Sequence, residues 1–199
     1  MKVEEPVSDY GSLDLNRTYS YVDYLRWQFK ERVELIRGKV FKMAPAPSTN
    51  HQAILSNLGM HFLNFFREKP CNVFLAPFDV RLPIVKPGKN YTVVQPDISI
   101  ICDGSKLDKL GCNGSPDLVV EIISPGNTAH DTVIKYEIYE EAAIKEYWMI
   151  DPDKRMVLTF ALQDRKYVGI KPYVEGQLIR STLFPGLKIR VNDIFRKLV

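Results

Sequence analysis

Three acidic residues lie within or beside apolar, β-branched runs in the middle of the chain. Asp97 is in VVQPDISII, and Asp117 and Glu121 are in SPDLVVEIIS. A carboxylate inside such a run loses hydration, which costs free energy unless a cation meets it. Two or three carboxylates that converge on one point form an oxygen site suited to Mg²⁺ or Mn²⁺. A divalent-metal site is therefore one interpretation of these acids.

Strand geometry decides which of the acids can converge. Residues two apart in a strand share a face, so Asp117 and Glu121 point the same way. Asp97 can reach that region if its strand pairs with the strand of Glu121. Pro-Asp pairs are also common in turns, and for Asp117, at a strand entry, that alternative is equally good. Glu121 lies between Val119-Val120 and Ile122-Ile123, where a turn has no use for a carboxylate, which favours a functional acid.

The N-terminal part supplies elements that must position these acids. Apolar spacing predicts a helix over residues 18–29, with Thr18 or Ser20 as its cap. Two strand-like runs on either side of Arg37-Gly38 predict a β-hairpin. Ser48 then opens a run whose apolar spacing predicts a buried helix.

The rest of the chain contains the central strands. After Pro70, which closes that helix, residues 71–85 predict an interrupted strand, and the apolar runs at 91–103 and 115–124 predict interior strands covered on both faces. The polar, glycine-rich segment between these two runs predicts a loop. A helix is expected over residues 129–143, capped by Asn127 or Thr128. Further strands and a short terminal helix complete a mixed α/β sheet.

Length and composition indicate one ordinary folded domain. The chain has 199 residues, 45% hydrophobic and 26% charged, which excludes a disordered or collagen-like chain. No apolar run approaches the ~20 residues that cross a bilayer, and the polar N-terminus resembles neither a secretory signal nor a transit peptide, so we expect a cytoplasmic protein. Cys71, Cys102 and Cys112 lack paired zinc spacing, which predicts reduced thiols without a disulfide framework or metal cluster. A net charge of +3 neither supports nor excludes nucleic-acid binding.

Several segments together resemble the Uma2 family. The matching segments are VELIRGKVFKMAPAP, NHQAILSNL, VVQPDISII, PDLVVEIISPGN, DTVIKYEIYEEAAIKEYWMIDP and LFPGLKIRVNDIF, and the resemblance covers about residues 18 to 195. The family consists of predicted endonucleases with the restriction endonuclease-like, PD-(D/E)XK fold. The resemblance implies a mixed α/β core, with a mixed central sheet flanked by helices and extra β-hairpins. We expect an N-terminal arm at residues 1–17 and a single domain at 18–199.

The resemblance also assigns site residues. Asp97 takes the place of the motif's first acid and Glu121 that of its second. The motif's lysine, two residues beyond the second acid, falls on Ile123. In this family the lysine has moved to the next helix, where Lys135 fits, and its long side chain can reach back over the strand. Glu34 matches an acid common in the family, which implies a further metal contact. Since Glu34 alternates with apolar neighbours, an outward-facing, solvated or ion-paired side chain is the alternative.

The roles implied for these residues follow from phosphodiester hydrolysis. Asp97 and Glu121 would hold one or two Mg²⁺ or Mn²⁺ ions, which polarise the phosphate and lower the pKa of an attacking water. Lys135 would orient that water and stabilise the negative charge that develops on phosphorus. The alternative for Lys135 is an exposed ion pair with Asp131.

Three further residues are supporting candidates. Asp117 lies at the entry of the second central strand. Tyr136 follows Lys135 on the helix and is expected to pack near the site. His51 comes shortly after Ser48 and could face the site from the start of a helix, although a lone histidine is more often structural.

The function that the resemblance implies is metal-dependent cleavage of DNA by an endonuclease, acting as a homodimer because strand cleavage often needs two sites. Two alternatives use the same scaffold. One is a nucleic-acid-binding or assembly module with weak or no activity, since a fold does not guarantee a function. The other is a hydrolase of another phosphoester. The sequence shows no recognition helix or zinc module from which base specificity could be read.

Overall fold

The computed structural model describes residues 5–43, 46–84, 91–124 and 129–198, and for residues 129–131 it describes the backbone alone. Within these ranges the α-helices are α1 (Tyr21–Tyr24), α2 (Thr49–Phe66), α3 (Ala129–Glu141) and α4 (Val191–Ile194). Short 3-10 turns occupy Tyr10–Ser12 and Gly104–Lys106. None of the helices in the described ranges has the length and apolar character needed to span a membrane.

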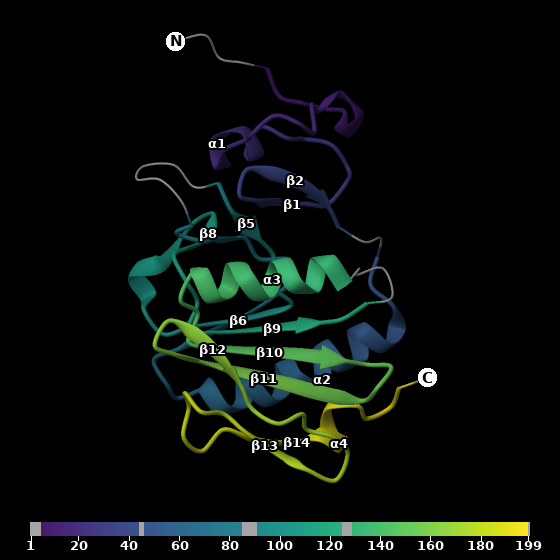
Figure 1. Ribbon diagram of the computed structural model, residues 1–199, viewed down its shortest axis with the longest axis vertical. Coiled ribbons are helices and arrows are strands. Elements are labelled where there is room, and N and C mark those ends of the chain that lie inside the picture. The colour runs from purple at the N-terminus through teal and green to yellow at the C-terminus, as the bar shows by residue number, and fades with distance from the viewer. Residues whose placement is uncertain (1–4, 44–45, 85–90, 125–128, 199) are drawn as a thin grey trace.

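A six-stranded mixed sheet forms the centre of the molecule (Figure 1). Neighbouring β9 and β10 are parallel, and the other pairs are antiparallel. α3 connects the two parallel strands, because such a pair needs a long crossover. The strand order is β12 (Lys166–Gly169), β11 (Met156–Gln163), β10 (Glu146–Asp151), β9 (Leu118–Ile122), β6 (Ile98–Ile101) and β3 (Asn72–Leu75).

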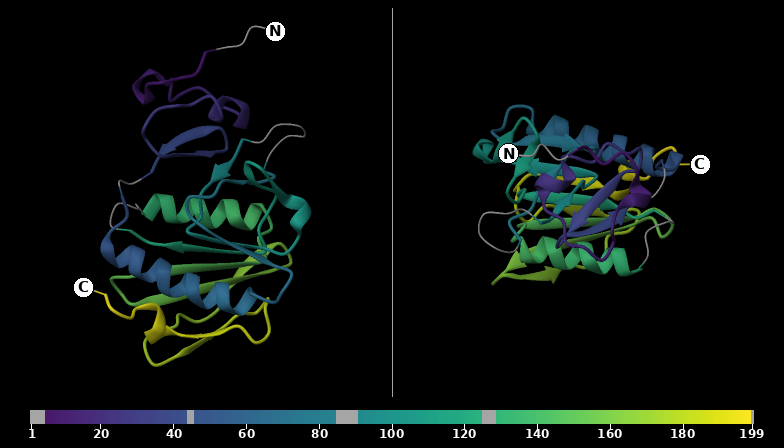
Figure 2. Two further views of the ribbon diagram at one scale, coloured as in Figure 1. Left: turned by 180° about the vertical axis from the view of Figure 1, so that it is seen from behind. Right: turned by 90° about the horizontal axis from the view of Figure 1, so that it is seen from above.

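Helices cover both faces of this sheet, with α2 on one side and α3 on the other, as the view from above in Figure 2 shows. Leu118, Val120 and Ile122 of β9 share a buried core with α2, whereas Val119 belongs to the core beneath α3. The expectation of interior strands covered on both faces is therefore confirmed for β9. Glu121 alternates with these residues and lies on the α3 side, like Val119.

A second six-stranded sheet carries the predicted hairpin as its β1–β2 pair. Its turn residues, Arg37 and Gly38, have φ values of 50° and 80°, the left-handed pair that suits a two-residue hairpin turn. A Cβ at Gly38 would collide with the side chain of Thr18, so glycine is required there. The strand order is β2 (Lys39–Lys42), β1 (Val33–Ile36), β5 (Val93–Val94), β4 (Val80–Arg81), β8 (Gly111–Asn113) and β7 (Leu107–Asp108).

The N-terminal segment differs from the expected helix over residues 18–29. α1 has four residues, and Ser20 caps it in a capping box with Asp23. The helix stops early because the backbone that follows pairs with Val7. Val7 N donates to Arg26 O, and Gln28 N donates to Val7 O.

Three other boundaries are corrected. α2 begins after its predicted cap Ser48 but ends at Phe66, before Pro70. The interrupted strand at 71–85 is divided between the two sheets, with β3 in the central one and β4 in the second. The expected loop between the central runs contains the short antiparallel pair β7–β8. The predicted caps of α3, Asn127 and Thr128, lie outside the described residues.

The cysteines also differ from expectation. Cys71 and Cys102 form a disulfide, while Cys112 is free and buried, so the prediction of reduced thiols is wrong for the first two. In the β3–β6 ladder Asn72 pairs with Ile101, and the next position of this antiparallel register brings the two cysteines opposite each other. Spacing along the sequence does not reveal this pairing, because it depends on which strands are neighbours.

The C-terminal segment closes the α2 side of the core. β13 (Leu178–Arg180) and β14 (Lys188–Arg190) form an antiparallel hairpin that leads into α4. Ile179, Ile189 and Ile194 are buried with the inner face of α2. This confirms the expected further strands and short terminal helix.

Candidate active site

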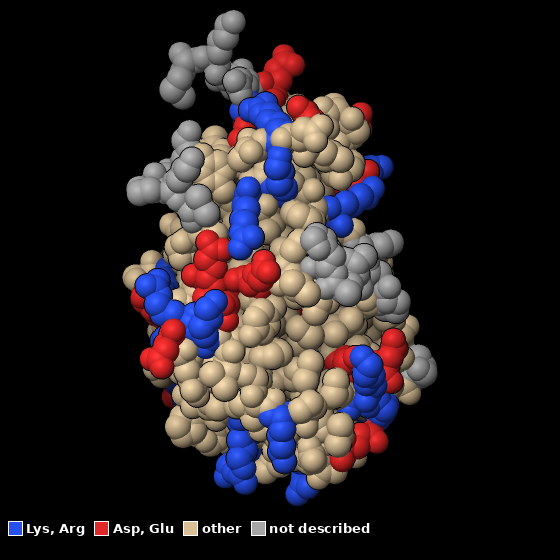
Figure 3. All heavy atoms as spheres, in the orientation of Figure 1, with Lys and Arg blue, Asp and Glu red and all other residues tan. Residues whose placement is uncertain are grey.

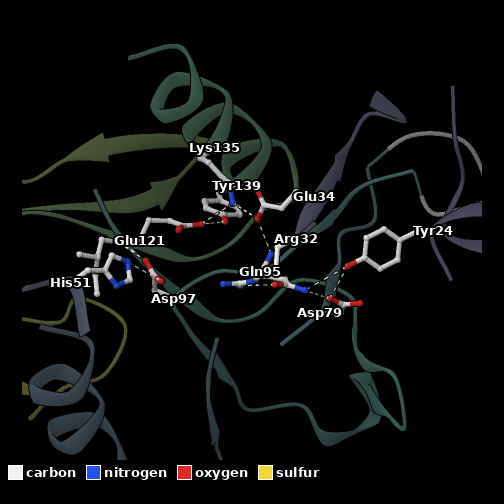
Figure 4. A network of polar contacts seen from close by, with 11 residues as sticks. Tyr24, Arg32, Glu34, His51, Asp79, Gln95, Asp97, Glu121, Lys135 and Tyr139 are labelled. Atoms are coloured by element: carbon white, nitrogen blue, oxygen red, sulfur yellow. Dashed lines mark hydrogen bonds and ion pairs between the residues drawn. The ribbon is translucent and has the colours of Figure 1, made fainter. Parts of the chain in front are cut away.

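Asp97 and Glu121 lie next to each other at one end of the central sheet. β6 and β9 pair antiparallel with Ile98 opposite Val120, and the next position of this register places Asp97 opposite Glu121. Asp97 Oδ2 accepts a 2.8 Å hydrogen bond from Ile122 N, which fixes its carboxylate against β9. The expectation that the strands of the two acids pair is therefore confirmed, and Figure 4 shows both side chains at this end of the sheet.

Lys135 reaches from α3 to the acid pair. Its Nζ donates to Glu121 Oε1 at 3.1 Å and to Glu34 Oε1 at 2.5 Å. Tyr139, one helical turn further along α3, donates its hydroxyl proton to the same oxygen of Glu121. The Lys135 side chain is only 13% exposed, so it is not the solvated surface lysine of the alternative interpretation. Asp131, the partner named in that alternative, has a side chain that is not among those the structure describes.

Burial and neighbouring charges shift the pKa values of this cluster. Loss of hydration is the main reason why the pKa of Glu121 is raised to about 7; the Lys135 ammonium lowers it, and the charge of Asp97 raises it. Burial alone would lower the pKa of Lys135, but the carboxylates of Glu121 and Glu34 hold it above its ordinary value. Burial and the nearby carboxylates also keep the pKa of Tyr139 well above its usual range. Lys135 and Tyr139 are therefore protonated donors at neutral pH.

Glu34 faces the interior of the molecule. Its side chain is 7% exposed and accepts hydrogen bonds from Gln95 N at 2.8 Å and from Lys135. The outward-facing alternative is wrong because β1 lies between β2 and β5 and all four of its residues are buried. Alternation between an apolar inside and a polar outside does not apply to such a strand.

His51 contacts the first acid of the pair. Its Nε2 lies 3.3 Å from Asp97 Oδ1, and its side chain is 9% exposed. Ser48 accepts a hydrogen bond from His51 N and so fixes the first turn of α2. Burial lowers the pKa of His51, but the hydrogen bond and the charge of Asp97 outweigh this effect and raise it. The contact between His51 Nε2 and Asp97 Oδ1 orients the Asp97 carboxylate.

Asp117 and Tyr136, the other two supporting candidates, contact other parts of the molecule. Asp117 pairs with Lys145 at 2.7 Å, at the opposite end of β9 from Glu121. The two acids are four strand positions apart, a separation of roughly 13 Å, so sharing a face does not make them converge. Tyr136 donates its hydroxyl to Tyr167 O at 3.3 Å. Its role is packing α3 against β12, and it does not line the site.

Three further polar residues at the site were not singled out by the sequence. Tyr139 follows Lys135 by four positions, and this spacing on one helical face was an available signal. Gln95 and Arg32 had no such signal. Gln95 lies in the short connection between the two sheets, where its backbone meets Glu34, and a contact between sheets leaves no local pattern in the sequence.

These residues surround a cavity of about 530 Å³. Its polar lining residues include Glu34, Asp97, Glu121, Lys135, His51, Gln95 and Arg32. Apolar residues from the β1–β2 hairpin, the segment after it, α2 and α3 also line the cavity. These apolar residues are Ile36, Phe41, Met43, Ala46, Pro47, Leu55 and Ile134. A concave site with a few convergent polar groups is typical of ligand binding.

The donors at the cavity fit a hard divalent cation that shares its coordination with other groups. Mg²⁺ is usually held by one or two carboxylates, with waters and phosphate oxygens completing its shell, and Asp97 and Glu121 supply two carboxylates. In the parts of the chain that the structure describes, no three His, Cys, Asp or Glu side chains are grouped to hold a metal ion. The Lys135 ammonium contacts both Glu34 and Glu121 and so occupies the space between these two carboxylates. The residues present therefore fit an open metal site and not a closed cage.

A solved structure has the same fold. The crystal structure of a "putative nuclease belonging to DUF820" from Anabaena variabilis matches with a TM-score of 0.68 and 20% sequence identity, over 88% of this chain and 97% of that chain. The mixed sheet between α2 and α3 therefore has the fold of that solved protein, which confirms the predicted mixed α/β architecture.

Comparison of the sequence with protein-family models identifies the family of this chain. The model of the Uma2 family, described as "Putative restriction endonuclease", matches residues 21–192, and the chain belongs to this family. It is also 29% identical over 131 residues to an uncharacterized protein of Synechocystis sp.. That alignment covers 64% of this chain and 66% of the relative, just under two thirds of the relative's length.

Proposed function

We propose that this protein is a divalent-metal-dependent endonuclease that hydrolyses phosphodiester bonds in DNA. The observation that carries the proposal is the meeting at one cavity of Asp97, which directly precedes β6, Glu121 of β9 and Lys135 of α3. A carboxylate pair beside a protonated amine is the combination that phosphodiester hydrolysis needs. Membership of a family described as restriction endonucleases supports this reaction class.

Asp97 and Glu121 would hold the ion, Mg²⁺ or Mn²⁺, with Glu34 as a further carboxylate at the same cavity. When bound, such an ion polarises the phosphate and lowers the pKa of a water. Other residues fix the two carboxylates before substrate arrives. Ile122 N holds Asp97 Oδ2, and Tyr139 donates to Glu121. Fixed donors and acceptors reduce the reorganisation that the reaction requires.

Lys135 supplies the positive charge that the family motif otherwise places on the strand. The strand position is occupied by Ile123, which packs against the core beneath α3. Two carboxylates hold the pKa of Lys135 above its ordinary value, so the amine acts as a hydrogen-bond donor and not as a base. An ammonium in this place stabilises the negative charge that develops on phosphorus and orients the attacking water.

A specific observation favours a second candidate, a nucleic-acid-binding or assembly module without activity. Lys135 already neutralises Glu34 and Glu121 in part, so these buried acids have a cationic partner without any metal. In such a protein the cluster would stabilise the fold and nothing else. Binding of a divalent ion that depends on Glu121 distinguishes the nuclease from this module.

The partner we propose is DNA, cleaved by a homodimer because two strands require two sites. The face drawn in Figure 3 does not suggest a DNA surface, since its acidic and basic side chains lie in small groups separated by uncharged surface and form no broad basic patch. On α3, Glu137 and Glu141 are paired with Arg37 of the β1–β2 turn, at 3.8 Å and 2.8 Å. Light scattering of the protein with and without DNA tests the dimer; a monomer that cleaves both strands would exclude it.

The experiment that tests the proposed function compares cleavage of single-stranded, duplex and branched DNA in Mn²⁺ by the wild type and Glu121→Ala. We expect the wild type to cut at least one of these forms and the variant to be at least about a hundredfold slower. Glu137→Ala, which removes an exposed carboxylate of α3, is the matched control and should cut at the wild-type rate. Equal rates for the wild type and Glu121→Ala would refute the mechanism.

A further inference from the structure

The face of the β1–β2 hairpin that meets the cavity carries an arginine next to the acids. Arg32 directly precedes β1, and Met43 N donates to Arg32 O, so the hairpin ladder continues to this position. Residues two apart in a strand share a face, which places Arg32 on the side of Glu34. Both residues line the cavity, and Figure 4 shows Arg32 beside Gln95.

Arg32 differs from the lysines that line the cavity because it has no acidic partner within the described parts of the chain. Lys135 is held by two carboxylates, and Lys42 pairs with Glu31 at 3.7 Å. Arg32 Nη2 donates to the neutral Oε1 of Gln95 at 2.8 Å. A guanidinium has five N–H donors in a planar fork, so most of its donors remain available to an anion.

A chain of hydrogen bonds behind Arg32 fixes its position. Gln95 Nε2 donates to Asp79 Oδ1 at 2.8 Å, and Tyr24 OH donates to the same oxygen at 3.2 Å. The backbone N of Gln95 holds Glu34 Oε1 at 2.8 Å. Gln95 therefore connects the guanidinium to the carboxylate that holds Lys135. The arginine and the acid cluster keep a set distance from each other, as preorganised binding requires.

We infer that Arg32 binds a phosphate of the nucleic-acid strand next to the phosphate that is cleaved, and that Gln95 is its positioning residue. This inference rests on the proposed function, because the second phosphate is the one that a polynucleotide substrate offers beside the reacting phosphodiester. The planar fork of arginine matches two phosphate oxygens at once. Within the described residues, no ion pair of Arg32 has to break before its charge meets a phosphate. A contact with the phosphate backbone carries no information about the bases. Arg32 should therefore contribute equally to the binding of every DNA sequence.

The test is steady-state cleavage of a DNA oligonucleotide in Mn²⁺ by the wild type and Arg32→Gln. We expect KM to rise about tenfold while kcat changes little, because the lost contact binds ground state and transition state alike. The negative slope of log(kcat/KM) against log[salt] should become shallower by about 0.7 to 0.9, the value of one phosphate contact. Arg32→Lys should restore part of the binding.

Two matched changes identify the contact. Arg180→Gln removes an exposed arginine of β13, far from the cavity lining, and should leave KM unchanged. Replacing the neighbouring phosphate of the substrate by an uncharged methylphosphonate should weaken binding by the wild type but not further weaken Arg32→Gln. Introduced into the wild-type protein, Gln95→Ala should raise KM. Introduced into Arg32→Gln, it should raise KM little further, since the two side chains act together.

The outcomes separate this inference from the proposed function. If Arg32→Gln and Arg180→Gln have the same KM and salt slope while the wild type cleaves DNA, the role of Arg32 is wrong and the nuclease stands. The same conclusion follows if the methylphosphonate weakens substrate binding by the wild type and by Arg32→Gln equally. If the wild type cleaves no DNA in any form, the proposed function fails, and the assignment of Arg32 fails with it.

Discussion

Lys135 Nζ lies 3.1 Å from Glu121 Oε1, although the two residues are 14 positions apart and belong to α3 and β9. The family motif places its lysine two residues after the second acid, where this chain has Ile123. A lysine on α3 therefore brings its ammonium to the acid pair from outside the sheet. The same ammonium contacts Glu34 of β1, so one side chain joins the two sheets and the helix.

Replacing Lys135 by methionine should destabilise the protein. The change leaves Glu34 and Glu121 buried without their cationic partner, and breaking a buried pair in this way costs about 3 kcal/mol. Urea unfolding at neutral pH measures the effect. Lys145→Met is the matched control, because Lys145 is 58% exposed beside Asp117 and an exposed partner contributes less than about 1 kcal/mol. Equal losses in the two variants would show that the Lys135 cluster is not a buried ion pair.

The raised pKa of Glu121 should make the stability of the metal-free protein depend on pH. The folded-state pKa is about 7, above the ordinary value of 4.5. A group with a raised pKa contributes stability below its unfolded pKa, and this contribution is lost as the pH rises through the folded pKa. Relative to Glu121→Gln, the wild type should lose about 2 to 3 kcal/mol between about pH 4.5 and pH 7.

Urea unfolding of both proteins in EDTA, at several pH values across this range, measures the difference. The Glu121→Gln variant cannot titrate at this position, so its own pH dependence gives the contribution of all other groups. A constant difference between the two proteins over the whole range would show that the pKa of Glu121 is not raised.

Replacing His51 by alanine should weaken metal binding without removing a carboxylate. His51 Nε2 contacts Asp97 Oδ1 at 3.3 Å, and loss of a residue that orients a metal ligand typically costs about tenfold in affinity. Calorimetric titration with Mn²⁺ measures the change. His61→Ala, on the same helix but outside the cavity lining, should bind as the wild type does. Identical affinities for the two variants would leave His51 a purely structural residue.

The cysteines offer a test of the fold that is independent of function. The chain has three cysteines, of which Cys71 and Cys102 are paired. The denatured protein should release one reactive thiol without reductant and three after reduction. Burial raises the pKa of Cys112 to about 11, so the native protein should react very slowly at pH 8. Three thiols in the unreduced denatured protein would exclude the disulfide.

Local patterns in the sequence predicted the elements whose conformation is set by nearby residues. The hairpin at Arg37-Gly38, the Ser48 cap and the alternation along β9 were all predicted, because turn chemistry, capping and strand period are local. The length of α1 was not, since it depends on pairing with Val7. The division of residues 71–85 between two sheets, and the disulfide, depend likewise on which strands become neighbours.

The candidate site shows the same limit. Asp97, Glu121 and Lys135 were predicted from the sequence, and all three line one cavity. Glu34 was left undecided because its burial depends on β1 lying between two other strands. Gln95 and Arg32 were missed, because their contacts cross between segments more than 60 positions apart.

Binding of Mn²⁺ to the wild type, Asp97→Asn and Glu121→Gln, measured by calorimetry, tests the central claim most directly. We predict that the wild type and the control Glu137→Gln bind the ion and that both site variants bind it at least about tenfold more weakly, because each loses a charged oxygen ligand. Undiminished Mn²⁺ binding by Asp97→Asn and Glu121→Gln would contradict the proposal that these two acids hold the metal of a nuclease.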